Sequence, residues 1–92
     1  AITTRATPAQ VNTEVLDVLS VDTFAEPGQG APAATTTLVS KIGYLYKSWR
    51  NKKDQSATTQ KLYADDGTTV DQKSTVSETG GVVEVGEVAT GP

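Results

Sequence analysis

Apolar residues recur at helical spacing near the start of the chain. Val11, Val15 and Val18 follow one another at intervals of four and three, with Leu19 beside them. This spacing places the four side chains on one face of an α-helix. Residues 7–10, TPAQ, carry helix-start signals: a threonine N-cap, a proline at the first helical position and a glutamine that completes a capping box. A three-turn helix alone is marginal in water, so we expect these four residues to dock on another surface.

A second apolar stripe lies in the middle of the chain. Leu38, Ile42, Leu45 and Trp49 are spaced four, three and four, as in the seam of a coiled coil. The spacing predicts a helix that packs against copies of itself through these four residues.

The ends of this second helix also have recognisable signals. We expect it to begin near Thr35, with Thr35 or Thr36 as the N-cap. At its end, Arg50 is expected to fix a helix-to-strand junction by pairing with a carboxylate or capping carbonyls, and Asn51 to serve as C-cap. Gly43 costs the helix about 1 kcal/mol relative to alanine. We therefore expect another backbone to approach the helix closely at this position.

Residues 22–34, DTFAEPGQGAPAA, separate the two helices. Their prolines and glycines interrupt regular structure, and Phe24 is the only large apolar side chain among them. Thirteen such residues are long for a loop inside a compact domain, so the segment is interpreted as a linker that lets the first helix reach another surface.

The periodicity changes to two after residue 54. Strands are predicted over residues 55–64, 68–76 and 82–88, with turns at 65–67 (DDG) and 77–81 (SETGG). The sequence therefore predicts an α+β fold: two short helices joined by a Pro/Gly linker, then a small three-stranded antiparallel β-meander.

This pattern divides the chain into three parts. Residues 1–21 form an N-terminal arm and docking helix, residues 22–34 the linker, and residues 35–92 a helix plus β-meander module. Three strands with one weak apolar face are near the lower limit of independent stability, so we expect the module to be completed by association.

Composition strengthens the expectation of an oligomer. The chain has 92 residues, of which 36% are hydrophobic, and neither cysteine nor histidine. Disulfides are excluded, and a structural zinc site is not expected, so association is the remaining way to support a small core. The net charge of −3 is unevenly placed: residues 41–53 hold five basic residues and no acid, and residues 62–92 six acids against one lysine. Such blocks suit packing between copies.

The sequence contains no constellation typical of an enzyme, a metal site or a cofactor site. Asp65, Asp66 and Asp71 lack the spacing of a calcium loop, and the DDG motif is interpreted as a turn. The basic residues near Trp49 resemble a nucleic-acid contact, but the chain is acidic overall, so that function is not favoured. No apolar run is long enough to span a membrane.

From residue 22 to about residue 81 the sequence resembles a module of tailed-bacteriophage virion proteins. In that module a Pro/Gly linker precedes a helix that ends in an aromatic–Arg-Asn-Lys signature, followed by a Thr-rich strand, a DDGT turn and a TVS strand. The residues that carry the resemblance are Leu45, Tyr46, Trp49, Arg50, Asn51, Lys52, Leu62, Tyr63, Asp65, Asp66, Gly67, Thr68, Thr75, Val76 and Ser77.

The resemblance implies a non-enzymatic structural component of the virion, of the tail, fibre, collar or head-decoration type. Such proteins are often symmetric and commonly trimeric, so the expected partners are copies of this chain, as a homotrimer, and other phage virion proteins. A receptor-binding or carbohydrate-binding tip is an alternative, for which only Tyr63 offers an aromatic on the sheet. A second alternative is that both apolar stripes simply form the core of one chain.

Overall fold

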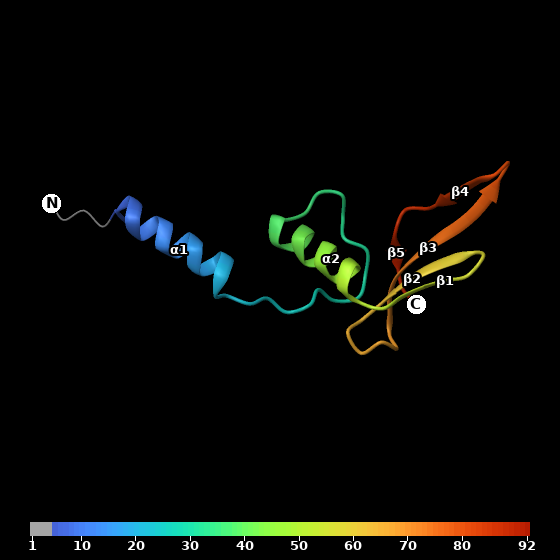
Figure 1. Cartoon of the computed structure of the whole chain (residues 1–92), viewed down its shortest axis with the longest axis horizontal. Coiled ribbons are helices and arrows are strands. Elements are labelled where there is room, and N and C mark those ends of the chain that lie inside the picture. Colours follow the sequence, from blue (N-terminus) through green and yellow to red (C-terminus); the bar gives the residue numbers. More distant parts are fainter. Residues whose placement is uncertain (1–4) are drawn as a thin grey trace.

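The computed structural model describes residues 5–92, and the first four residues of the predicted arm lie outside the described residues. The molecule is elongated, with principal extents of 70 × 29 × 18 Å. Its radius of gyration is 19.1 Å, against about 12 Å for a compact domain of this length. One helix lies at one end, a second helix in the middle and an antiparallel sheet at the other end (Figure 1). The predicted α+β class is confirmed.

Helix α1, Pro8–Ser20, begins as its sequence predicts. The Thr7 hydroxyl accepts a hydrogen bond from the Gln10 N–H at 3.1 Å, and the Gln10 side chain accepts one from the Thr7 N–H at 2.8 Å. This reciprocal pair is the capping box, and Pro8 occupies the first helical position. No residue of α1 is buried.

Helix α2, Leu38–Arg50, begins slightly later than predicted. The N-cap is Thr37, not Thr35 or Thr36, because the Thr37 hydroxyl accepts from the Ser40 N–H at 3.2 Å. The sequence alone does not show which of the three consecutive threonines is the N-cap, because each can cap a helix. Asn51 is the C-cap, with its N–H donated to Lys47 O at 2.9 Å, and the chain leaves the helix in an extended conformation.

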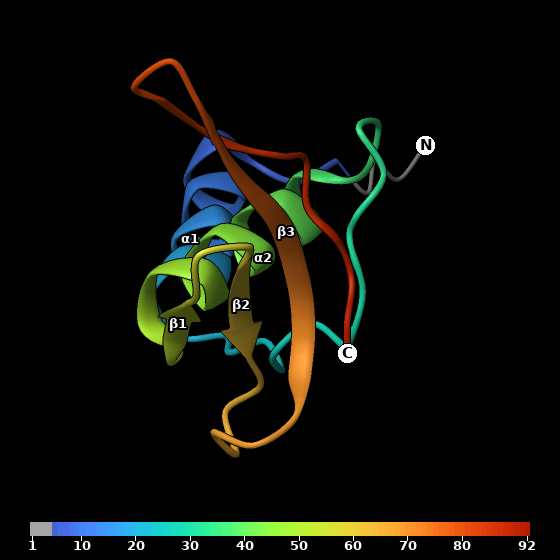
Figure 2. The ribbon, with the colours of Figure 1, turned by 90° about the vertical axis from the view of Figure 1, so that its right-hand side faces the viewer.

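The sheet has five short strands where three were predicted. They are β1 Lys53–Gln55, β2 Thr59–Tyr63, β3 Val70–Thr79, β4 Val82–Val85 and β5 Ala89–Thr90. The order is β1-β2-β3-β4, all pairs are antiparallel, and β5 pairs with β3. The sheet curls, with β3 running through it as the longest strand (Figure 2).

Two of the predicted strands are shorter in the structure than expected. Within residues 55–64 the Ser56 hydroxyl accepts from the N–H groups of Thr58 and Thr59, at 3.3 and 3.1 Å, and closes a turn between β1 and β2. Within residues 82–88 the Gly86 N–H donates to Thr75 O at 2.8 Å, after which the chain leaves β4 and returns to β3 as β5. The third difference is that Ser77–Thr79, predicted as turn, extends β3.

The DDG segment forms the predicted turn. Gly67 has φ +73°, a left-handed conformation that glycine adopts without strain. Asp66 accepts hydrogen bonds from the N–H groups of Thr68 and Thr69, at 2.8 and 2.9 Å, and from the Thr69 hydroxyl at 2.7 Å. The backbone bonds from Thr69 and Thr68, followed by the Thr69 hydroxyl, lower the pKa of Asp66 to about 2.

This depressed pKa predicts a pH-dependent contribution to stability. The folded pKa lies below the ordinary value, so the contribution is present above about pH 4 and is lost as the pH falls towards about 2. Wild type should therefore lose more of its free energy of unfolding over this range than Asp66→Asn does. Urea unfolding followed by circular dichroism measures the difference, with Glu84→Gln on exposed β4 keeping the wild-type profile. Equal losses in wild type and Asp66→Asn would show that ionised Asp66 does not stabilise the folded chain.

Buried side chains are few, and most of them are polar. Within residues 5–92 the buried apolar residues are Leu62 and Val76, whereas Lys47, Asn51, Asp71 and Gln72 are the buried polar ones. The molecule exposes 7219 Å², against about 5,100 Å² for a compact monomer of 9.6 kDa. The interior of a single copy is thus a polar junction between α2 and the sheet, with little apolar core. No helix of the described part is both long and apolar enough to cross a membrane.

Candidate functional site

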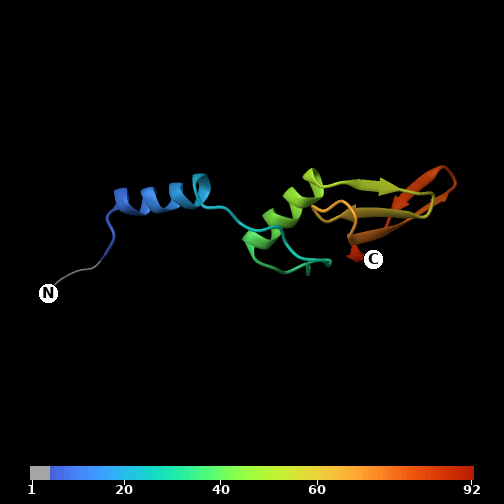
Figure 3. The ribbon, with the colours of Figure 1, turned by 90° about the horizontal axis from the view of Figure 1, so that it is seen from below.

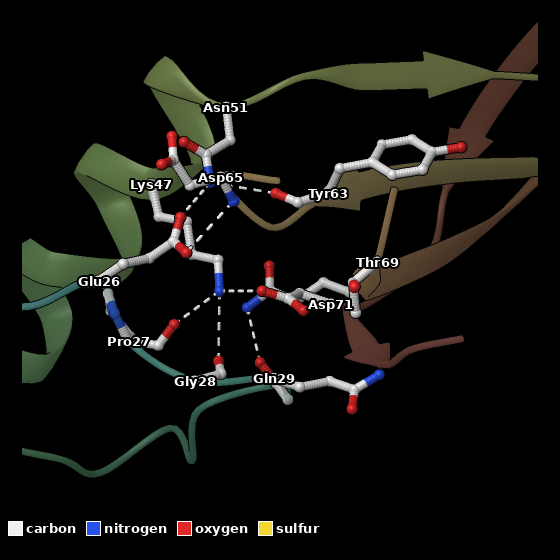
Figure 4. Close-up of polar contacts among 12 residues, drawn as sticks. Glu26, Pro27, Gly28, Gln29, Lys47, Asn51, Tyr63, Asp65, Thr69 and Asp71 are labelled. Atoms are coloured by element: carbon white, nitrogen blue, oxygen red, sulfur yellow. Dashed lines mark hydrogen bonds and ion pairs between the residues drawn. The ribbon is translucent and has the colours of Figure 1, made fainter. Parts of the chain in front are cut away.

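The polar junction centres on Lys47, on the inner face of α2. Its side chain is 1% exposed, and its Nζ forms an ion pair with Asp71 of β3 (Figure 4). The same Nζ donates to Pro27 O at 2.7 Å and to Gly28 O at 3.3 Å. Three acceptors therefore meet the three N–H groups of the ammonium, which is the condition for burying a lysine without a large penalty.

The carbonyls that Lys47 binds belong to the segment that was predicted as a linker. Gln29 donates to Val70 O at 2.9 Å, and Gln72 donates to Gly30 O at 2.8 Å. The Gly30 N–H in turn donates to Asp71 O at 3.2 Å. Residues 26–31 contain no helix or strand, yet they are held between α2 and β3.

Arg50 and Asn51 both lie at the helix-to-strand junction, in different environments. The Asn51 side chain is buried and donates to Glu26 and, at 3.1 Å, to Tyr63 O. The Arg50 guanidinium is exposed and pairs with the Asp65 carboxylate, whose hydrogen bond raises the pKa of Arg50. Of the two residues, Asn51 ties three segments together, whereas the exposed Arg50 pair contributes little to stability.

Gly43 is explained by the same inner face of α2. A Cβ at this position would lie 3.0 Å from the Cγ of Pro27. The expectation of a close backbone from elsewhere is corrected, because the neighbour is a proline ring of the same chain. Gly43 and Lys47 are one turn apart, and together they form the surface on which residues 26–31 lie.

The predicted self-association residues occupy the opposite face of α2. Successive helical residues are about 100° apart, so Lys47 lies about 200° around the helix from Leu45 and from Trp49. Exposure is 72% for Leu38, 58% for Ile42, 72% for Leu45 and 76% for Trp49. One face of α2 therefore contacts the rest of the chain, and the seam on the opposite face is exposed to solvent.

The predicted docking residues of α1 are also exposed. Val11, Val15 and Val18 are each about half exposed and Leu19 is 78% exposed. Leu16, which was not included among them, is 53% exposed. The helices follow one another along the long axis, and helix α1 lies beyond one end of α2 (Figure 3). The alternative in which both stripes form the core of one chain is not the arrangement seen.

Sequence reasoning missed Lys47, Asp71 and the fixed part of the linker. Lys47 is one of five basic residues between positions 41 and 53, and nothing in the sequence distinguishes it from a solvated lysine. The available signal was its position: it lies on the helix face opposite the seam, one turn after Gly43. Within residues 5–92 no group of acidic residues is arranged to hold a metal ion.

Comparison with protein-family models, with curated proteins and with solved structures gives no match to this chain.

Proposed function

We propose that the chain is a non-enzymatic structural component of a bacteriophage particle. In this proposal it self-associates through the exposed seam of α2, as a homotrimer, and docks on other virion proteins through α1. The phage assignment rests on the sequence resemblance between residues 22 and 81. The self-association rests on the structure of the single chain.

The observation that carries the proposal is the surface that one copy leaves exposed. The excess over a compact monomer is about 2,100 Å² per chain. A standard protein interface covers about 800 Å² of each partner, and obligate oligomers cover more. The excess is therefore what a subunit of an obligate assembly would have to cover.

The position of the seam supports helix-to-helix packing between copies. The inner face of α2 is occupied by residues 26–31 and the sheet, and its outer face presents a coiled-coil spacing. Two or more copies can therefore join through the outer face without disturbing the polar junction.

Some of the side chains that would serve the rival functions are engaged in contacts within the chain. A carbohydrate-binding tip would use Tyr63, but the Tyr63 hydroxyl donates to Asp54 at 2.5 Å and its ring lies 4.5 Å from the Lys52 Nζ. Nucleic-acid binding would use the basic residues 50–53 beside Trp49. Among these, Arg50 pairs with Asp65, and Lys53 donates to the last carbonyls of α2.

The presence of the chain in particles tests the virion assignment. Particles of a phage whose genome encodes this sequence would be purified through two density gradients. Their proteins would then be identified by mass spectrometry. We expect peptides of the chain to band with the capsid and tail proteins in a fixed ratio. Recovery only from infected-cell extract, and never from particles, would remove the virion assignment.

A further inference from the structure

A cleft lies between α2 and the face of the sheet that turns towards it. Its volume is about 420 Å³, and its walls come from α2, from the linker residues around Ala33 and from strands β2 and β3. Leu45, Leu62 and Val88 supply apolar surface, and no acidic residue lines the cleft. A cleft of this size in so small a chain is large enough for a bulky side chain.

The polar groups around the cleft suit an aromatic occupant with one hydrogen-bond donor. Lys41 lies at its wall, where a lysine can approach the face of a ring. Ser48, Gln60 and Ser74 also line it and offer side-chain oxygens that can accept from an indole N–H.

Trp49 is the best match among the exposed side chains. It is the only tryptophan, is 76% exposed and contacts Tyr46, with ring centroids 6.0 Å apart. It does not line the cleft of its own chain. It borders an adjoining groove that shares Leu45, Ser48 and Lys53 with the cleft, so the seam and the cleft form one continuous concave surface.

We propose that Trp49 of one copy inserts into the cleft between α2 and the sheet of a second copy. The inference rests on the proposed self-association and names the contact that fixes its register. In the proposed trimer each copy gives one tryptophan and receives one, and such a head-to-tail contact forms a ring when the rotation between copies closes. Buried aromatic anchors in pockets typically dominate the binding energy of an interface.

The sole tryptophan makes its own environment measurable. Ser74→Tyr fills the cleft from β3, on the sheet face that Gln60 and Gln72 share. Thr75→Tyr places the same side chain on the neighbouring residue, which is exposed on the opposite face, and serves as the matched control. Trp49 fluorescence and its quenching by acrylamide are measured at concentrations where light scattering shows the oligomer.

We expect blue-shifted, poorly quenched emission in wild type and in Thr75→Tyr. In Ser74→Tyr the emission should move to longer wavelength and quenching should rise severalfold. Mixing Ser74→Tyr with Trp49→Phe should restore blue-shifted emission, because the remaining tryptophan can enter the unfilled cleft of the other variant. If Ser74→Tyr does not fold by circular dichroism, Ala33→Phe fills the cleft from its exposed wall instead.

Two results would contradict the proposal, and only the second would also contradict the proposed self-association. An oligomeric Ser74→Tyr with wild-type emission would show that Trp49 is not in the cleft. Self-association would survive that result. A wild type that stays monomeric at every concentration would remove this contact together with the proposed self-association.

Discussion

Lys47→Met is expected to lower the free energy of unfolding by about 3–5 kcal/mol, because it leaves Asp71 as a buried carboxylate without its cation. The Asp71 side chain is 5% exposed, and the carbonyls of Pro27 and Gly28 lose their donor as well. Small domains have only about 5–15 kcal/mol in total, so the variant should be largely unfolded under mild conditions. Urea unfolding followed by circular dichroism measures the loss.

Lys41→Met is the matched control for this loss. Lys41 lies on the same helix but is exposed, so the same substitution should change the free energy of unfolding by no more than about 0.5 kcal/mol. The double variant Lys47→Met with Asp71→Leu removes both charges and should recover much of the stability. A Lys47→Met variant as stable as Lys41→Met would show that the junction does not hold the chain together.

The second large effect is expected from Ile42→Asp, in the middle of the α2 seam. Ile42 is 58% exposed in one copy, so an aspartate there costs a single chain little. In an assembly the same carboxylate would be buried between helices without a partner, which the interface cannot tolerate. We therefore expect Ile42→Asp to abolish self-association over the accessible concentration range.

Two comparison variants locate this effect. Val83→Asp introduces the same carboxylate on β4, at a side chain that is 58% exposed like Ile42 and lies outside the seam and the cleft, and should keep much more of the association. Val15→Asp alters the α1 stripe, which is proposed to bind other virion proteins, and should leave the mass unchanged. Equal loss in all three variants would point to a general charge effect rather than to the seam.

Sequence reasoning succeeded where a structural feature depends on residues close together in the chain. The capping box of Thr7 and Gln10, the helical spacing of both stripes and the turn at Asp66 and Gly67 are all local, and each appears as predicted. Local signals also misplaced boundaries: adjacent threonines made the N-cap of α2 ambiguous, and the turn at Ser56 was read as strand.

The sequence failed where the feature depends on residues far apart. Lys47 is 24 positions from Asp71 and 20 positions from Pro27 in the sequence, and no local pattern predicts either contact. The linker was predicted to make no fixed contacts because its prolines and glycines exclude regular structure. Its carbonyls nevertheless accept hydrogen bonds from the buried ammonium of Lys47. Within residues 5–92 two apolar side chains are buried, so polar contacts of this kind have to organise the described part of the chain.

The mass of the protein in solution shows whether the exposed face of α2 joins copies of this chain. Light scattering coupled to size exclusion would be run on wild type and on Ile42→Asp at matched concentrations. We expect a closed oligomer for wild type, with three times the 9.6 kDa chain mass, and a monomer for Ile42→Asp. A folded wild-type monomer at all concentrations, or an Ile42→Asp oligomer of unchanged mass, would contradict this expectation.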